Sequence, residues 1–321
     1  MSPTILVTGA TGRQGGATAR YLLDRGLHVR ALVRTKSSAA ALDLHSRGAV
    51  LVEGNYDEPE QLQSAFENAT AVFLNVLPSF LGDGAELRQA TNIVRAARAS
   101  GTVTTLVYTS VYAIDQHDKV LGWHDGTVSN FLKSYFDSKT AIEDLVRSAG
   151  FVHWTILRPP VFMTNYFLPG VKNNFPELAE SRILRTAAIP EIRTMLIDPD
   201  DIGGFVAVAL MEPERFSHRA IDIGSEALTT QQVASAISEA SGREIVVEYI
   251  PRDLAESLAP SNPQIGSQLW LCELQHSFEP EELAAEFGIQ LTKFKDFLAT
   301  NQERVRKTFG AYAHCNWQAQ Q

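Results

Sequence analysis

The chain has 321 residues, of which 45% are hydrophobic and 20% are charged, so it is long enough to bury a full-sized core. Its net charge of -9 disfavours partnership with nucleic acid or with an anionic membrane surface. No apolar run reaches the roughly 18 residues of a membrane span, and the N-terminus enters a strand without a signal peptide, so we expect a cytoplasmic location. The two cysteines, Cys272 and Cys315, are too few for a disulfide framework or a metal site, so no metal is expected.

Residues 4–20 have the order strand, glycine turn and helix, which is the first half of a dinucleotide-binding unit. The apolar run at 5–7 predicts a buried strand, and a helical pattern begins near Gly15. Gly9 can take the positive φ of a tight turn, Gly12 leaves room for a pyrophosphate, and Gly15 allows the helix to pack on the strand. The free N–H groups at the start of the helix then favour phosphate. Against the alternative of a plain turn, we predict cofactor contacts from Gly9, Thr11, Gly12, Arg13, Gln14 and Gly15.

The predicted second strand, residues 28–33, ends where a dinucleotide presents its adenosine ribose. Proteins that bind NAD place a carboxylate there, which accepts hydrogen bonds from the ribose hydroxyls. This chain instead has Arg34, followed by Lys36, and a guanidinium can pair with the 2′-phosphate of NADP. We therefore predict NADPH or NADP as the cofactor, held by Arg34 and Lys36. The alternative is a solvated arginine at the end of a strand.

Strands alternate with helices through the N-terminal half, which predicts an α/β fold with a doubly wound parallel sheet of Rossmann type. Asn75 and Val76 fall at the end of the fourth strand, where ligands approach such a sheet, and are expected to contact the cofactor. On the helix predicted from about residue 130, Glu143 and Asp144 are expected to be solvated. The third to sixth strands are expected at residues 49–53, 71–75, 104–108 and 152–157.

The C-terminal half predicts a smaller α+β region that is discontinuous in the sequence. Thr229 and Gln232 have the spacing of a capping box and predict a helix that ends near Gly242. Strands are expected at 194–197 and 220–223, and helices at 198–211, 280–288 and 292–309. We divide the chain into a dinucleotide-binding domain of 1–157 to which 194–224 returns, a substrate or lid region of 158–193 and 225–310, and a disordered polar tail of 311–321.

The string Val-Thr-Gly-Ala-Thr-Gly-Arg-Gln-Gly-Gly at residues 7–16 spaces its glycines as Gly-x-x-Gly-x-x-Gly. Arg-Pro-x-x-Phe stands at 158–162, Asp-Pro-x-Asp-Ile-Gly at 198–203, and Leu-Thr-x-x-Gln at 228–232. With these motifs the chain resembles the NmrA-like family of the short-chain dehydrogenase/reductase superfamily. The resemblance runs nearly end to end, as far as about Gly310, and implies a fold that binds a dinucleotide.

In this superfamily, a Tyr and a Lys four residues apart on one helix point at the nicotinamide. Tyr135 and Lys139 have this spacing, and Ser110 stands at the end of the preceding strand. The resemblance implies that Tyr135 donates a proton to the substrate oxygen and that Ser110 bonds this oxygen. It also implies that Lys139 holds the ribose and lowers the pKa of Tyr135. The alternatives are that Tyr135 merely lines a pocket and that Thr109 takes the role of Ser110.

Further contacts follow from the resemblance. The segment 54–57 is similar to a Gly-Asp-x-x-Asp turn near the adenine, which assigns Asn55 to the cofactor. The turn after the sixth strand is similar to an Arg-Pro turn whose backbone brackets the nicotinamide, which assigns Pro160 and Val161. Aromatic residues beyond the nicotinamide are expected to form the wall of a substrate pocket, unless they are simply core. These residues are Trp123, Phe162, Tyr166 and Phe167.

Two functions agree with these motifs. The favoured one is an NADPH-dependent reductase that delivers hydride to a carbonyl, quinone or activated double bond of a small apolar molecule. The other is a non-enzymatic regulator that senses NADP(H) and binds a partner protein, as NmrA does. Tyr135, Lys139 and Ser110 together favour the enzyme, because a sensor has no use for a proton donor beside the nicotinamide. A nucleotide-sugar epimerase with bound NAD is disfavoured by Arg34.

Overall fold

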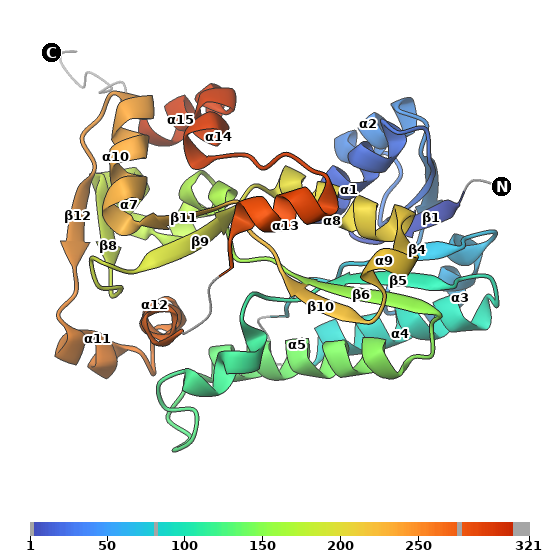
Figure 1. The fold of residues 1–321 in the computed structure, drawn as a ribbon, viewed down its shortest axis with the longest axis horizontal. Helices are drawn as coiled ribbons and strands as arrows, with labels where there is room; N and C mark the ends of the chain where they lie inside the picture. The colour runs from blue at the N-terminus through green and yellow to red at the C-terminus, as the bar shows by residue number, and fades with distance from the viewer. Residues whose placement is uncertain (1–2, 80–82, 275–277, 311–321) are drawn as a thin grey trace, which may run out of the picture.

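A seven-stranded sheet forms the centre of the computed structural model, which describes residues 3–79, 83–274 and 278–310 (Figure 1). Its strands are β1 (Thr4–Val7), β2 (His28–Val33), β3 (Val50–Glu53), β4 (Ala71–Leu74), β5 (Thr105–Thr109), β6 (His153–Arg158) and β10 (Arg219–Asp222). Their order is β10-β6-β5-β4-β1-β2-β3, and all neighbours run parallel. The order reverses between β1 and β4, which is where doubly wound sheets bind their ligands. The predicted fold class is confirmed.

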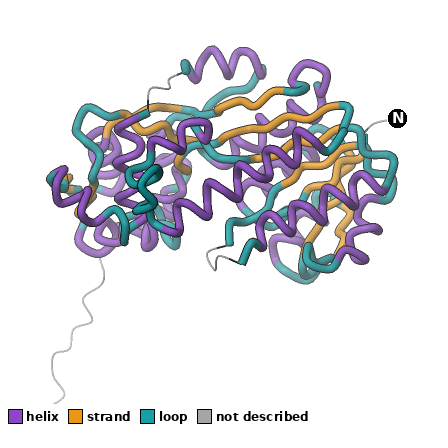
Figure 2. Tube along the Cα trace, turned by 90° about the horizontal axis from the view of Figure 1, so that it is seen from below, coloured by secondary structure: helices purple, strands orange, loops and turns teal. Residues whose placement is uncertain are grey.

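Two layers of helices cover the two faces of this sheet. Neighbouring residues of a strand point to opposite faces, so Ile5 and Val7 pack into the first layer while Leu6 packs into the second. Figure 2 views the second layer, with helices lying across the strands. Both faces are therefore buried, which explains the continuous apolar runs of the central strands. The first layer has α1 (Arg13–Leu23), α2 (Ala39–Ser46) and α8 (Pro199–Met211), and the second has α3 (Pro59–Leu62), α4 (Ala85–Ala99) and α5 (Asn130–Ser148).

The C-terminal region, at the left of Figure 1, contains two small sheets. The first has the order β11-β9-β7, with β7 (Val161–Phe162), β9 (Arg193–Ile197) and β11 (Glu226–Thr229), and the second pairs β8 (Ile183–Thr186) with β12 (Val246–Tyr249). The remaining α-helices are α6 (Val171–Asn174), α7 (Pro176–Ser181), α9 (Pro213–Phe216), α10 (Thr230–Ser241), α11 (Arg252–Leu258), α12 (Pro263–Glu273), α13 (Pro280–Phe287), α14 (Phe294–Thr300) and α15 (Gln302–Phe309). Short 3-10 helices are η1 (Gln63–Phe66), η2 (Ile114–Lys119) and η3 (Met163–Tyr166).

The predicted capping box is confirmed, since Thr229 and Gln232 exchange hydrogen bonds at the start of α10, and Gly242 ends this helix in the left-handed conformation. The segment 194–224 is divided between the two parts of the molecule. Its first strand, β9, belongs to a small sheet, whereas β10 pairs with β6 in the main sheet. Within this segment, α8 and β10 therefore belong to the dinucleotide-binding part of the molecule, α8 in the first helix layer and β10 in the main sheet.

The prediction of one helix over 292–309 is wrong. Two helices occupy this segment, and the helical conformation is interrupted at Asn301. The side chain of Asn301 donates to the Phe297 carbonyl at 2.9 Å. The break turns α15 so that Phe309 contacts the ring of Phe167, on which Phe297 also stacks. Packing in this core therefore overrides the helical pattern.

Across residues 3–79, 83–274 and 278–310, no helix combines the length and hydropathy needed to cross a membrane. In the same ranges, no three His, Cys, Asp or Glu side chains gather as potential metal ligands. The tail of 311–321, which was predicted to be disordered and contains Cys315, lies outside the described residues.

Candidate active site

The glycine turn between β1 and α1 leaves the start of α1 open. Gly9 has a φ of 61°, and the Gly12 N–H donates to the Gly9 carbonyl at 2.8 Å. A Cβ on Gly15 would lie 2.2 Å from the same carbonyl oxygen, so only glycine allows α1 to pack this closely. No side chain caps α1, and its first turn carries no acidic residue. The turn and the free N–H groups fit the pyrophosphate of a dinucleotide.

Asn75, at the end of β4, lies directly against this turn. Its backbone N–H donates to the Thr8 hydroxyl at 2.7 Å, and this hydroxyl lies 3.2 Å from the Asn75 carbonyl oxygen. A Cβ on Gly9 would come within 2.9 Å of the Asn75 side chain. Val76, which was predicted beside it, is 3% exposed and packs into the second layer. Asn75 therefore borders the predicted cofactor site, while the Val76 side chain is core.

Tyr56 braces the glycine turn, and no sequence motif marks this contact. Its hydroxyl accepts the Gly9 N–H at 2.5 Å, and its carbonyl accepts the Asn92 side chain at 2.9 Å. Burial raises the pKa of Tyr56, which keeps the hydroxyl neutral. The contact joins the turn after β1 to the segment after β3, so it depends on the tertiary structure.

Arg34 and Lys36 follow β2 and are both exposed. Arg34 has no hydrogen bond or ion pair with any residue that the structure describes, so its guanidinium can take a phosphate. Lys36 donates its backbone N–H to the Glu53 carboxylate at 3.4 Å. Asn55, predicted near the adenine, accepts the Asp57 N–H on its side-chain oxygen at 3.1 Å and so stabilises a local turn.

Arg13 links the start of α1 to the C-terminal region. Its guanidinium donates to the Thr164 hydroxyl at 3.1 Å and to the Asn165 side chain at 3.4 Å. Partial burial and the charge of Arg304 lower the pKa of Arg13, which remains protonated at neutral pH. This predicted cofactor residue thus connects the phosphate-binding turn with the segment after β7.

Lys139 is buried, and its ammonium forms an ion pair with Glu86 at 2.7 Å. The side chains of Lys139 and Glu86 are 5% and 3% exposed, and they come from α5 and α4. The ammonium also lies 5.6 Å from the centre of the Tyr108 ring and 5.9 Å from that of the Tyr135 ring. The structure therefore brings Tyr135 and Lys139 together, and it adds Glu86, which the sequence did not single out.

The prediction that Lys139 lowers the pKa of Tyr135 is wrong. Burial, and then the carboxylate of Glu86, raise this pKa above the value of a free phenol. A negative charge beside the ring opposes the phenolate, and the same charge neutralises the ammonium of Lys139. Tyr135 is therefore a weaker proton donor than a free tyrosine.

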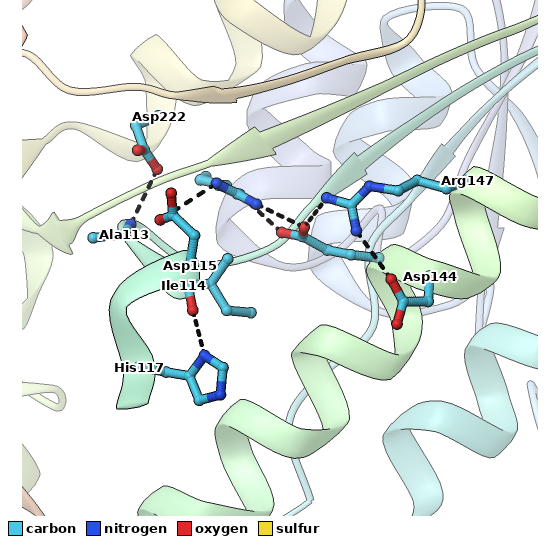
Figure 3. Close-up of polar contacts among 9 residues, drawn as sticks. Ala113, Ile114, Asp115, His117, Asp144, Arg147 and Asp222 are labelled. Carbon is cyan, nitrogen blue, oxygen red and sulfur yellow. Dashed lines mark hydrogen bonds and ion pairs between the residues drawn. The ribbon is translucent and has the colours of Figure 1, made fainter. Parts of the chain in front are cut away.

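Beside this site, the carboxylate of Glu143 pairs with both Arg147 and Arg158 in a network of charged side chains. Figure 3 labels Arg147, Asp144 and Asp115 of this network. Arg158, at the end of β6, donates two hydrogen bonds to Glu143, at 3.0 and 2.9 Å. Arg147 donates a third at 2.5 Å, and Asp115 lies 3.7 Å from Arg158. The prediction that Glu143 is solvated is wrong, because its side chain is 2% exposed. Asp144, the neighbouring residue, is 70% exposed.

Ser110 is directed toward this network. It follows β5, and its backbone N–H donates to the Leu157 carbonyl at 2.8 Å. Burial opposes the ionisation of Glu143, but the hydrogen bonds and the charge of Arg158 outweigh it and lower the pKa of Glu143. Thr109, the alternative to Ser110, is buried at the end of β5.

The four aromatic residues predicted as a substrate wall lie in three different clusters. Tyr166 and Phe167 are 5% and 1% exposed and belong to the core of the C-terminal region. Phe162 packs against the core of the first layer. Trp123 meets the His117 ring edge-on, 4.6 Å between centres, on the loop after η2. Packing therefore accounts for Tyr166 and Phe167, and the structure does not gather the four into one wall.

A different hollow lies beside Lys139. It has a volume of about 380 Å³ and opens between α5 and the segment that joins β4 to α4. Phe131 and Tyr135 stack along it, with ring planes 3° apart and ring centres 6.4 Å apart. Glu86 also lines it and pairs with the buried Lys139 ammonium at 2.7 Å. The only sequence signal was the spacing of four between Phe131 and Tyr135, which places both on one helical face.

A doubly wound sheet with an open phosphate-binding turn at its switch point defines a protein of the dinucleotide-binding class. The model of the NmrA-like family matches residues 1–303, and the chain belongs to this family.

Relatives and solved structures agree with this assignment. The (4-alkanoyl-5-oxo-2,5-dihydrofuran-3-yl)methyl phosphate reductase of Streptomyces griseus is 30% identical over 256 residues, which are 79% of this chain and 79% of the relative. The crystal structure of NmrA, a negative transcriptional regulator, in complex with NADP has a TM-score of 0.71 at 19% identity, over 94% of this chain and 96% of that one. The NADPH-dependent quinone oxidoreductase QOR2 of Escherichia coli, in complex with NADPH, has a TM-score of 0.69 at 21% identity, over 92% and 99%. The two structures share the fold of this chain.

Proposed function

We propose that this protein is an NADPH-dependent reductase that delivers hydride to a carbonyl, quinone or activated double bond of a small apolar molecule. The observation that carries the proposal is the buried Lys139 ammonium, which pairs with Glu86 and lies near the ring of Tyr135, two residues that line an aromatic hollow. A protein that only senses a dinucleotide needs no buried charge at such a hollow, whereas reduction of a carbonyl requires a proton donor. The relative from Streptomyces griseus is named a reductase, which supports the same class.

NADPH would be held by the residues at the carboxyl edge of the sheet. The open start of α1 and the bare Gly12 would take the pyrophosphate, and the unpaired Arg34 would take the 2′-phosphate. When it is bound, the cofactor supplies the hydride. Asn75 and Tyr56 contribute by fixing the glycine turn from the sides.

Lys139 is the residue that would donate the proton. Its ammonium has three N–H donors and pairs with Glu86 at 2.7 Å, and it would donate to a ribose hydroxyl and a substrate oxygen. Tyr135, with its raised pKa, would serve as a wall of the hollow together with Phe131. This wall, along with Leu87, is flat and mostly apolar, which suits an aromatic ketone, a quinone or an enone.

Oxidation of NADPH, followed at its absorbance with a panel of quinones, enones and aromatic ketones, tests the proposal. Lys139→Met should lower turnover by about 10²–10⁴-fold, the usual contribution of a general acid. Tyr135→Phe should lower it by less than about tenfold, because it removes only a hydroxyl of the wall. Lys295→Met is the matched control, since Lys295 forms an exposed ion pair with Glu239.

The results for the two variants distinguish the roles of Tyr135 and Lys139. Equal loss in Tyr135→Phe and Lys139→Met would restore Tyr135 as the acid, and full turnover in Lys139→Met would remove Lys139 from that role. NADPH binding without turnover of any acceptor would contradict the reductase and favour the regulator that binds a partner protein.

A further inference from the structure

The ion pair between Lys139 and Glu86 differs from other lysine pairs in the described part of the chain. Its side chains are 5% and 3% exposed, and the two charged atoms are 2.7 Å apart. The pairs of Lys133, Lys293 and Lys295 with carboxylates have side chains that are all at least 40% exposed. Surface pairs of that kind contribute little to stability, whereas a buried pair carries a large desolvation cost.

Glu86 is held from two directions by consecutive residues of α5. Lys139 pairs with one carboxylate oxygen, and the Ser138 hydroxyl donates to the other at 2.8 Å. The carboxylate therefore has a fixed orientation at the second position of α4, next to the hollow. Replacing a buried pair by apolar residues is often neutral for stability, so packing alone does not require these charges.

Three ionisable groups face the ammonium of Lys139. Glu86 comes from α4, Tyr108 from β5 and Tyr135 from the preceding turn of α5. Burial raises the pKa of both phenols, and the charge of Glu86 raises each of them further. Glu143 contributes to the same effect on Tyr108. The fixed negative charge thus favours the neutral form of both phenols.

We infer that Glu86 is a positioning residue of the site, which holds the Lys139 ammonium in place next to the Tyr135 ring at the edge of the hollow. The importance of this role rests on the proposed reductase, in which Lys139 donates the proton. The role itself concerns only residues of this chain, so it can be measured without cofactor or substrate.

The test is the rate at which acetic anhydride acylates Lys139 at pH 8 in the full chain, measured by mass spectrometry. Glu86→Gln keeps the size and the hydrogen-bonding capacity of the side chain but removes its charge. The ammonium of Lys139 then has no carboxylate to pair with, and its acylation should become at least about tenfold faster. Glu86→Asp keeps the charge and should remain within about threefold of the native rate.

Glu239→Gln is the matched control, because it removes the carboxylate from the 2.8 Å pair with Lys295 at the surface. Acylation of Lys295 should change by less than about twofold, since water already solvates both groups. A Glu86→Gln rate at Lys139 equal to the native rate would overturn the inference. So would an equal acceleration in Glu86→Asp, which would show that shape and not charge is involved.

A second readout follows the phenols. The absorbance of tyrosinate at 295 nm, taken as the difference between each protein and its Tyr135→Phe variant, should appear at lower pH in Glu86→Gln.

If Glu86→Gln does not fold, Ser138→Ala keeps the charge but frees one carboxylate oxygen, and acylation of Lys139 should rise about two- to threefold. No change in Ser138→Ala would then count against the inference.

These measurements separate the inference from the proposed function. A protein that reduces no acceptor but shows the Glu86→Gln effect on Lys139 would retain the positioning role and lose the reductase. A working reductase without that effect would retain the function and lose the role of Glu86. In a working reductase, Glu86→Gln should also move the alkaline limb of the pH–rate profile to lower pH.

Discussion

Gly15→Ala should destabilise the fold, whereas Gly12→Ala should mainly weaken NADPH binding. A Cβ at residue 15 would lie 2.2 Å from the Gly9 carbonyl oxygen and 2.8 Å from that of Thr8. Both are backbone atoms of the turn, so only a movement of α1 can relieve the overlap. At residue 12 the new Cβ would meet the Gly9 oxygen at 3.1 Å, which requires a shift of only a few tenths of an ångström.

The expected magnitudes follow from these distances. Overpacking typically costs about 1–3 kcal/mol, and contacts this short against backbone place Gly15→Ala at the upper end or above it. Helix α1 cannot simply move toward α8, because a Cβ at Gly203 would already lie 2.7 Å from the Ala17 carbonyl carbon. Gly12→Ala should cost about 1 kcal/mol, because alanine is a poor residue at the N-cap of α1.

Urea unfolding followed by fluorescence measures both free energies, and NADPH titration measures binding. We expect Gly15→Ala to lose about 3 kcal/mol or more, and Gly12→Ala to bind NADPH at least about tenfold more weakly while it stays folded. Equal unfolding free energies for the two variants would refute the packing argument. Native NADPH affinity in Gly12→Ala would refute the placement of the pyrophosphate.

Three further predictions concern single side chains. Arg34→Asp should collapse or invert a preference for NADPH over NADH of at least about tenfold, since an arginine–phosphate bond contributes about 1.5–3 kcal/mol; equal affinities in the native protein would contradict this. Tyr56→Phe removes the acceptor of the Gly9 N–H and should lower the urea-unfolding free energy by about 1–3 kcal/mol, and an unchanged value would show that this bond contributes nothing. Burial raises the pKa of Asp198 from 3.8 to about 6, so protonation of Asp198 stabilises the folded state. This stabilisation is complete below pH 3.8 and is lost as the pH rises through 6. Asp198→Asn keeps the cap of α8 and should raise stability by about 1–2 kcal/mol at pH 8 but not at pH 3.5; the same gain at both values would exclude titration of Asp198 as the cause.

Local patterns in the sequence predicted the elements that form the candidate cofactor site. The apolar run before Gly9 formed a buried strand, because a parallel strand covered on both faces has no polar side. The spacing of Gly9, Gly12 and Gly15 acts within one turn, so it could be read without knowing the rest of the fold. The capping box at Thr229 was equally local, and it was confirmed.

The environment of each candidate catalytic residue depended on contacts between distant segments. The pair of Tyr135 and Lys139 could be read from helical spacing, but the direction of the pKa shift of Tyr135 could not, since it depends on Glu86 from another helix. Glu143 appeared in the sequence as an ordinary helix charge, and only the approach of Arg158 shows why it is buried.

The sequence by itself determined the Rossmann-type class and the glycine turn after β1, and it showed an arginine directly after β2, because each depends on residues that are close along the chain. The tertiary structure alone decided which carboxylate accompanies Lys139, which aromatic residues line a hollow, and where the helix after residue 292 breaks. The physical reason is that the free energy of burying a charge or a ring depends on the groups packed around it. Those groups come from α4, α5 and β5, and only the folding of the chain brings them within reach of one another.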